Sequence, residues 1–194
     1  MKWLSSLAFL RPLLPDRVAL RKHLRKMALI FPLLAAVPFL QANLRDRANL
    51  EDRILAAHNR ERAALGVPPL IWNAKLAGDA GLWAEHLTRI GYLVHSIDDP
   101  RDPDPEGENL WAGTKHHYPP EAMVGLWTAE KRNFVPGLFP ANSRTGDLEN
   151  VGHYTQMMWR STRLVGCAVA TGARDDFLVC RYSEGGNVLG ERPF

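Results

Sequence analysis

The stretch from Gly152 to Ala170, GHYTQMMWRSTRLVGCAVA, decides how this chain folds. Its first half, from His153 to Trp159, predicts a short helix. Its second half begins the run from Val165 to Thr171, which is rich in small and β-branched residues and predicts a strand. A similar run covers Phe177 to Tyr182, and the turn-prone residues GARDD separate the two. We therefore expect a β-hairpin directly after a short helix.

Both cysteines of the chain fall within this hairpin. If the turn is centred on Ala173 and Arg174, Cys167 lies opposite Cys180. Facing Cα atoms in an antiparallel pair are about 4.5–5.5 Å apart, within the roughly 4.4–6.8 Å that disulfides span. We predict a disulfide between Cys167 and Cys180, with two buried thiols as the alternative. Because disulfides persist in oxidising compartments, the pair also indicates export.

Upstream of this stretch, helical spacing of apolar residues alternates with turn signals. Residues 96–107 are rich in Asp and Pro and predict a solvated loop. Helices that interleave with short strands predict the α+β class. The expected elements are a helix from Leu50 to Leu65, a second helix capped by Asn73 and ended by Gly91, a short strand from Tyr92 to His95, and a third helix from Pro119 and Pro120 to Asn133.

Several aromatic and polar side chains are expected to be structural. His58 and Asn59 lie in the first helix and are expected to form hydrogen bonds in the core, and His86 is expected on a helix face. Tryptophans bury a large area, so we expect them to anchor the core. These are Trp72, Trp83, Trp111, Trp127 and Trp159.

The first 42 residues form a basic leader that ends in an apolar run. Residues 1–26 hold seven Lys or Arg and one Asp, and residues 27–42, MALIFPLLAAVPFLQA, carry no charge. This order is typical of a signal peptide. We expect cleavage near Ala42, a linker over residues 43–49 and one domain over residues 50–194. The alternative is a membrane anchor at residues 27–42, although a spanning helix needs about 20 apolar residues.

The distribution of charge excludes one class of function. The chain has 24 Lys or Arg and 21 Asp or Glu, for a formal net charge of +3. The leader accounts for this excess, because residues 27–194 hold 17 basic and 20 acidic residues. A mildly acidic domain lacks the basic surface of a nucleic-acid binder. We expect no nucleic-acid partner, and a monomer exported to the periplasm or the cell exterior.

Further motifs accompany the 152–170 stretch in a fixed order. They are HNRER at 58–62, LIWNAKLAGDAGLWAEH at 70–86, HS at 95–96, GENLW at 107–111 and CRYSEGGNVLGERPF at 180–194. Together they resemble the signature of the CAP superfamily, which comprises cysteine-rich secretory proteins, antigen 5 and pathogenesis-related 1 proteins. The resemblance covers residues 50–194. It implies an exported, three-layer α-β-α sandwich with a small antiparallel sheet between helices.

Departures from the family pattern limit what the resemblance implies. The chain has neither the additional cysteines nor the cysteine-rich tail of many eukaryotic members. Ion-channel activities associated with such tails are therefore not expected.

The resemblance also implies a cleft formed by two histidines and two glutamates. By motif these are His95 of HS, Glu108 of GEN, Glu130 three residues after Trp127, and His153 of HYTQ. The residues alone do not single out either histidine, because no HExxH or CxxC spacing connects them.

We expect His95 and His153 to converge and to bind a divalent transition metal such as Zn²⁺ weakly, with no obligatory cofactor. Glu108 and Glu130 would orient the imidazoles or bind the metal through water. The competing expectation is a metal-free cluster in which the carboxylates form hydrogen bonds to the imidazoles.

For some members the resemblance implies binding of sterol or other lipid. The loop NFVPGLFP at 133–140 carries four apolar side chains, and an exposed apolar loop can mark a ligand surface. The sequence favours a loop folded back on the core, and contact of these residues with lipid is the other interpretation. They are Phe134, Val135, Leu138 and Phe139.

The expected function is therefore that of a non-enzymatic, secreted binding module. One alternative is a metal-dependent hydrolase or protease at the same cleft. Ser96 is a poor nucleophile for His95, because adjacent strand residues point to opposite faces. A second alternative is a signalling or structural module with a vestigial cleft, since GNVLGERPF at 186–194 resembles the terminal peptide released from plant pathogenesis-related members.

Overall fold

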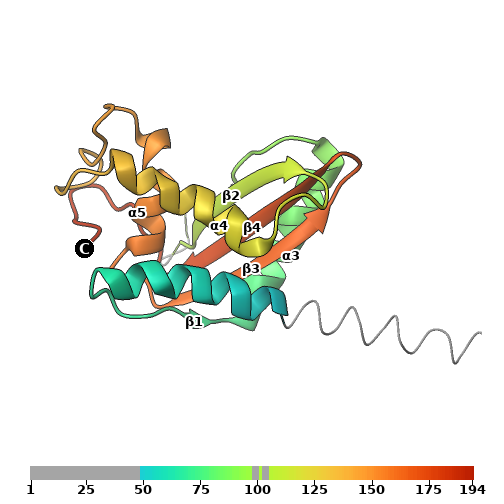
Figure 1. Ribbon diagram of the computed structural model, residues 1–194, viewed down its shortest axis with the longest axis horizontal. Helices are drawn as coiled ribbons and strands as arrows, with labels where there is room; N and C mark the ends of the chain where they lie inside the picture. Colours follow the sequence, from blue (N-terminus) through green and yellow to red (C-terminus); the bar gives the residue numbers. More distant parts are fainter. Residues whose placement is uncertain (1–48, 98–100, 102–104) are drawn as a thin grey trace, which may run out of the picture. The chain divides into compact units, whose positions relative to one another are not determined.

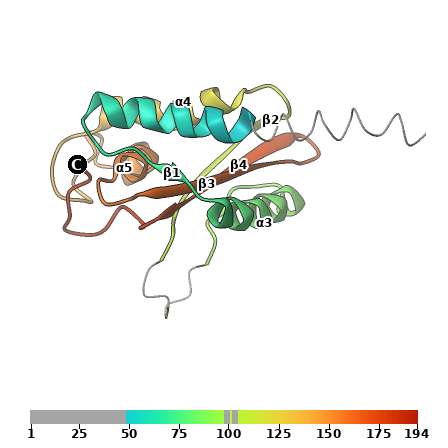
Figure 2. The ribbon, with the colours of Figure 1, turned by 90° about the horizontal axis from the view of Figure 1, so that it is seen from below.

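A four-stranded sheet lies between two layers of helices (Figures 1 and 2). The computed structural model describes residues 49–97, 101 and 105–194. The predicted leader, its cleavage point, the anchor alternative at 27–42 and most of the linker lie outside the described residues. No helix in the described ranges is long and apolar enough to cross a membrane.

The sheet is built on the predicted hairpin. Its strand order is β1 (Ile71–Trp72), β3 (Leu164–Thr171), β4 (Asp175–Ser183) and β2 (Gly107–Thr114). β3 and β4 are antiparallel and place Cys167 opposite Cys180, with a sulfur–sulfur distance of 2.04 Å. The predicted register and the predicted disulfide are both confirmed.

Two details of the sheet differ from expectation. The sheet is mixed, because β1 runs parallel to β3 and pairs only with Leu164 and Val165. The strand predicted from Tyr92 to His95 is wrong, since these residues form no strand and instead follow the end of a helix. β2, which was not predicted, takes the edge position beside β4 and carries the GENLW motif.

Helices cover both faces of the sheet, as the sandwich prediction requires. α3 (Ala74–Ile90) covers one face, and Figure 2 shows it alone on that side among the labelled helices. The helix of residues 49–64, α4 (Pro120–Ala129) and α5 (Gly152–Met158) lie on the other face. Each face has its own apolar core, one around Leu87 and Val179 and the other around Val124, Met157 and Tyr182.

Local signals explain where α3 begins and ends. The Asn73 side chain accepts hydrogen bonds from the backbone nitrogens of Lys75 and Leu76, which satisfies two free donors of the first turn. Gly91 closes the helix with a φ of 81°, a left-handed conformation that glycine adopts readily. Both predicted ends of this helix are confirmed.

Two short 3₁₀ helices bring further residues to the end of the sheet. η1 (Glu130–Asn133) continues directly from α4, whose first turn contains Pro120 as predicted. η2 (Leu148–Asn150) precedes α5 and is capped by the Asp147 side chain, which accepts from the Glu149 backbone nitrogen. This arrangement places Glu130 and His153 on adjoining elements.

One buried arginine ties the helix of residues 49–64 to the region after α5. The Arg62 guanidinium donates to the carbonyl oxygens of Pro68, Met157, Trp159 and Thr162 at 2.7–3.0 Å. Burial lowers the pKa of Arg62 to about 10, so the group still carries its charge at neutral pH. The carbonyl oxygens solvate a charge that would otherwise be costly to bury.

Candidate functional site

A cleft of about 650 Å³ contains both histidines expected at the site. Its lining includes His95, Glu108, Gly152 and His153. Asn109 of β2 also belongs to the lining. Three of the four expected residues thus line this cleft, whereas Glu130 is outside the lining and contacts His153.

His95 is held by Glu108, the first of the two expected carboxylates. Its Nδ1 lies 2.7 Å from Glu108 Oε1, and the same oxygen accepts the Ser96 backbone N–H at 3.0 Å. The Glu108 side chain is 7% exposed, whereas that of His95 is 65% exposed. A buried carboxylate thus fixes one ring nitrogen of an imidazole that faces the cleft.

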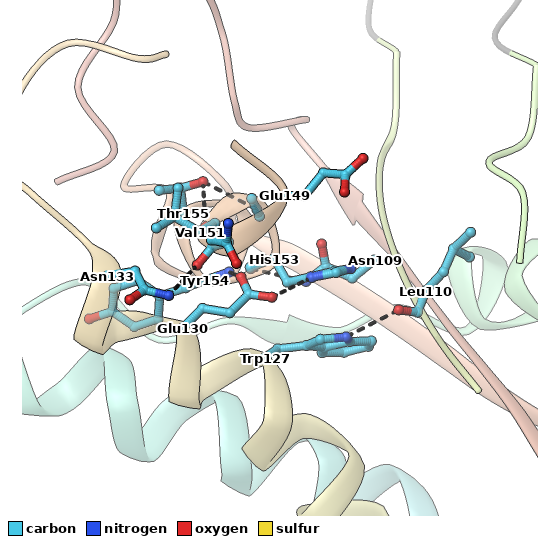
Figure 3. A network of polar contacts seen from close by, with 12 residues as sticks. Asn109, Leu110, Trp127, Glu130, Asn133, Glu149, Val151, His153, Tyr154 and Thr155 are labelled. Atoms are coloured by element: carbon cyan, nitrogen blue, oxygen red, sulfur yellow. Dashed lines mark hydrogen bonds and ion pairs between the residues drawn. The ribbon is translucent and has the colours of Figure 1, made fainter. Parts of the chain in front are cut away.

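His153 is held in the same way from the opposite side. Its Nδ1 lies 2.6 Å from Glu130 Oε1, and Glu130 Oε2 accepts the Tyr154 backbone N–H at 3.1 Å. Figure 3 shows Glu130 reaching from η1 to the start of α5. Each glutamate therefore contacts one imidazole nitrogen and one backbone nitrogen, although the two glutamates come from different elements.

Trp127 supports His153 from below in the view of Figure 3. The two rings are stacked, and the indole Nε1–H donates to the Leu110 carbonyl oxygen at 3.2 Å. Trp127 is a core residue, as predicted. Its contact with His153 was not predicted.

A buried polar chain leads from the core to the backbone of His153. His58 Nε2 lies 2.9 Å from the Tyr182 hydroxyl, and the Asn109 amide donates both to that hydroxyl and to the His153 carbonyl oxygen. Burial lowers the pKa of His58 to about 4, and burial raises the pKa of Tyr182. Both groups are uncharged at neutral pH, as their apolar surroundings require.

Comparisons with known proteins show the family of the chain. The family model described as "Cysteine-rich secretory protein family" (CAP) matches residues 55–182. The chain belongs to the CAP family. Pathogenesis-related protein PR-1 of Medicago truncatula is 35% identical over 148 residues, which cover 75% of this chain and 80% of that protein. Venom allergen 5 of Polistes dominula is 33% identical over 135 residues, 66% of this chain and 57% of that protein.

Solved structures of low sequence identity share the CAP fold. The crystal structure of NaASP2 with Zn²⁺ has a TM-score of 0.60 at 20% identity and covers 74% of this chain and 84% of its own. The structure of BmVAL-1 has a TM-score of 0.57 at 24% identity, with 75% and 81% covered. At these identities the likeness concerns the fold alone.

Arg181 distinguishes the two carboxylates of this CAP cleft. Its Nη2 lies 3.1 Å from Glu108 Oε2, and its Nη1 lies 3.5 Å from Glu106. Within the described part of the chain, neither Glu108 Oε2 nor Arg181 Nε has an aligned hydrogen-bond partner. Glu108 is therefore neutralised by a cation, whereas the second oxygen of Glu130 accepts a backbone N–H.

The histidine pair suits a weak metal site better than a closed one. Across the described ranges, no three His, Cys, Asp or Glu side chains are grouped closely enough to hold a metal ion. A structural zinc site uses four protein ligands, and both cysteines are joined to each other. Two imidazoles with carboxylates on Nδ1 fit a site that leaves positions open to water.

The predicted lipid loop is mostly folded back on the domain. Phe139 is buried and packs edge-on against Trp159, and Phe134 contacts Tyr154 and the C-terminal Phe194. Val135 is partly buried, and Leu138 is half exposed. The interpretation of a loop folded back on the core, which the sequence favoured, thus describes most of this loop, because neighbouring aromatic rings cover it.

Other residues of the cleft were not predicted from the sequence. Asn109 belongs to GENLW, so the motif contained the signal, but its bond to a distant carbonyl depends on tertiary structure. Asn187 lines the cleft, donates to the Gly152 carbonyl oxygen and accepts from Thr155. Glu149, an exposed residue of η2, is the second carboxylate of the lining beside Glu108.

Proposed function

We propose that this CAP protein is an exported binding module that binds a divalent transition metal ion weakly through His95 and His153. The observation that carries this proposal is the pairing of each Nδ1 with a carboxylate, in two imidazoles that line one cleft. Metal-binding histidines almost always donate their other ring N–H to such a partner. The zinc in the NaASP2 structure, which shares the fold, adds support.

Export is supported by the disulfide, by the family and by the leader sequence. The Cys167–Cys180 pair forms a disulfide, and such bonds persist in oxidising compartments. The family to which the chain belongs is described as secretory. The basic and apolar leader seen in the sequence is consistent with this route.

Calorimetric titration with Zn²⁺ tests the metal site. We expect saturable heat at about pH 7.5 and much weaker binding at about pH 5.5, because protons compete for ligating imidazoles. The variant His95→Ala with His153→Ala should lose the heat. A matched control, His116→Asn with His117→Ala, removes two exposed histidines elsewhere and should bind as the wild type does. Absence of saturable heat in the wild type, or an unchanged isotherm for His95→Ala with His153→Ala, overturns the proposal.

Lipid or sterol binding stays a separate proposal, and Leu138 is the place to test it. Its side chain is half exposed beside Phe139, which lines the cleft. We expect Leu138→Asp to abolish saturable binding of a fluorescent sterol if this loop is the contact. The hydrolase alternative is not proposed, because no contact in the described cleft favours it.

A further inference from the structure

The segment that carries His95 has little apolar packing to hold it. Residues 92–97 belong to neither helix nor strand. The large apolar side chains Tyr92, Leu93, Val94 and Ile97 are between 42% and 96% exposed. Burial of these side chains therefore contributes little to the position of His95, which must depend on specific polar contacts.

Two side chains anchor this segment on either side of His95. Glu108 accepts the backbone N–H of Ser96, the residue that follows His95. On the other side, the Trp83 indole Nε1–H donates to the carbonyl oxygen of Val94 at 3.0 Å. Val94 and Ser96 flank His95, so these two bonds hold the backbone on both sides of it.

Trp83 is itself held on a rigid element. It lies in α3 directly before Ala84, which is completely buried, and both ends of this helix are capped. Its indole ring stacks on the His86 imidazole, with centroids 4.6 Å apart and planes 19° apart. A residue one helical turn away thus restricts the rotamer that aims the indole N–H at Val94.

We propose that Trp83, braced by His86, is a positioning residue for His95. It joins the segment of residues 92–97 to α3 and so sets the distance between His95 and the His153 half of the cleft. The inference rests on the proposed metal site for its consequence, but the positioning itself is measurable without metal. Tryptophan at this position then has a role beyond packing.

Trp83→Phe is the decisive variant, because it keeps an aromatic ring at this position and removes the N–H donor, although the ring is smaller. Without metal, NMR spectra of the ¹⁵N-labelled protein should show broadened or shifted signals for the His95 ring and the Ser96 amide. The His153 ring signals should stay unchanged. Leu82→Ala, at an exposed neighbouring position of the same helix, is the matched control and should leave all of these signals in place.

Metal binding supplies the second readout. Loss of one neutral hydrogen bond predicts zinc binding weaker by about fivefold in Trp83→Phe, with no loss in Leu82→Ala. Electron paramagnetic resonance should detect Cu²⁺ bound to two imidazole nitrogens in the wild type. In Trp83→Phe it should detect a mixture of ions bound to two imidazole nitrogens and ions bound to one. His86→Ala should shift both readouts in the same direction, by less.

The outcomes separate the two proposals. Unchanged His95 and Ser96 signals in Trp83→Phe overturn the positioning role, whatever the metal affinity. Equal effects of Trp83→Phe and Leu82→Ala also overturn it, because they would show a general response of α3. If the wild type binds neither Zn²⁺ nor Cu²⁺, the metal function fails, and the metal-free spectra still decide whether Trp83 positions His95.

Discussion

Trp127 lies stacked on His153, with ring centroids 5.7 Å apart and ring planes inclined by 13°. A paramagnetic ion bound to this imidazole would be close enough to the indole to quench its fluorescence. We expect Cu²⁺ to produce a saturable loss of tryptophan emission. The measurement is a fluorescence titration, in which His153→Ala and Trp127→Phe should each lose most of this component. Equal quenching in the wild type and in His153→Ala would place the copper elsewhere.

Replacing Glu130 by glutamine should weaken zinc binding. The carboxylate accepts from His153 Nδ1 and fixes the ring, and loss of such partners typically costs about 10–100-fold in metal affinity. Calorimetry of Glu130→Gln measures the effect. Glu149→Gln is the matched control, because it removes a charge from the same cleft without touching either imidazole bond. Equal losses in the two variants would show that net charge, rather than the hydrogen bond, sets affinity.

Acid should destabilise the fold partly through His58. Its pKa falls from 6.5 in the unfolded chain to about 4 in the native state, because burial disfavours the imidazolium. Between these values the unfolded chain binds the extra proton, so stability decreases as the pH falls through this window. The full effect is about 3 kcal/mol by linkage.

Denaturant unfolding at several pH values tests this. In His58→Gln the free energy of unfolding should depend less on pH between about 6.5 and 4 than in the wild type. The variant is expected to be less stable at neutral pH, since it alters the bonds to Ile54 and Tyr182. An identical pH profile would contradict the assignment.

Two glycines should respond to alanine in opposite directions. A Cβ at Gly78 of α3 would meet nothing within 4 Å, so Gly78→Ala should stabilise the helix by up to about 1 kcal/mol. A Cβ at Gly166 of β3 would overlap the backbone nitrogen of Ala77, so Gly166→Ala should destabilise the sheet-to-helix contact. Thermal unfolding of both variants gives the signs. A stable Gly166→Ala would mean that α3 does not approach the strand so closely.

Removing the disulfide should cost stability without changing the sheet. Cys167 and Cys180 are 13 residues apart, and closing a loop of this size contributes about 3 kcal/mol through the unfolded state. We expect Cys167→Ala with Cys180→Ala to unfold at lower guanidinium concentration with an unchanged far-UV spectrum. The wild type under reducing conditions is the control, and it should unfold at the same lower guanidinium concentration with the same far-UV spectrum.

Features with local signals were predictable from the sequence. Asn73 and Gly91 delimit α3 because capping and the left-handed conformation depend on single residues. The hairpin register followed from a turn centred on Ala173 and Arg174, which places Cys167 opposite Cys180. By contrast, β1 has two residues, and its parallel partner lies more than 90 positions later, so no periodic pattern marks it.

The remaining differences depend on tertiary structure. Tyr92 to Val94 have the composition of a strand, but the edge beside β4 is taken by β2, and the segment is left unpaired. The four expected site residues were predicted through family motifs, since the individual side chains carry no spacing signal. The support that Trp127 and Asn109 give to His153 depends on elements brought together only in the fold.

The four carbonyl oxygens gathered by Arg62 limit how far the protein can be shortened. Three of them come from residues 95 to 100 positions downstream, in the region that follows the cleft histidine His153. A proteolytic fragment that starts after residue 64 would retain every cleft residue, yet it would leave these acceptors without their donor in a dry interior. Limited digestion should therefore either spare the helix of residues 49–64 or abolish the folded protein, with no stable product in between.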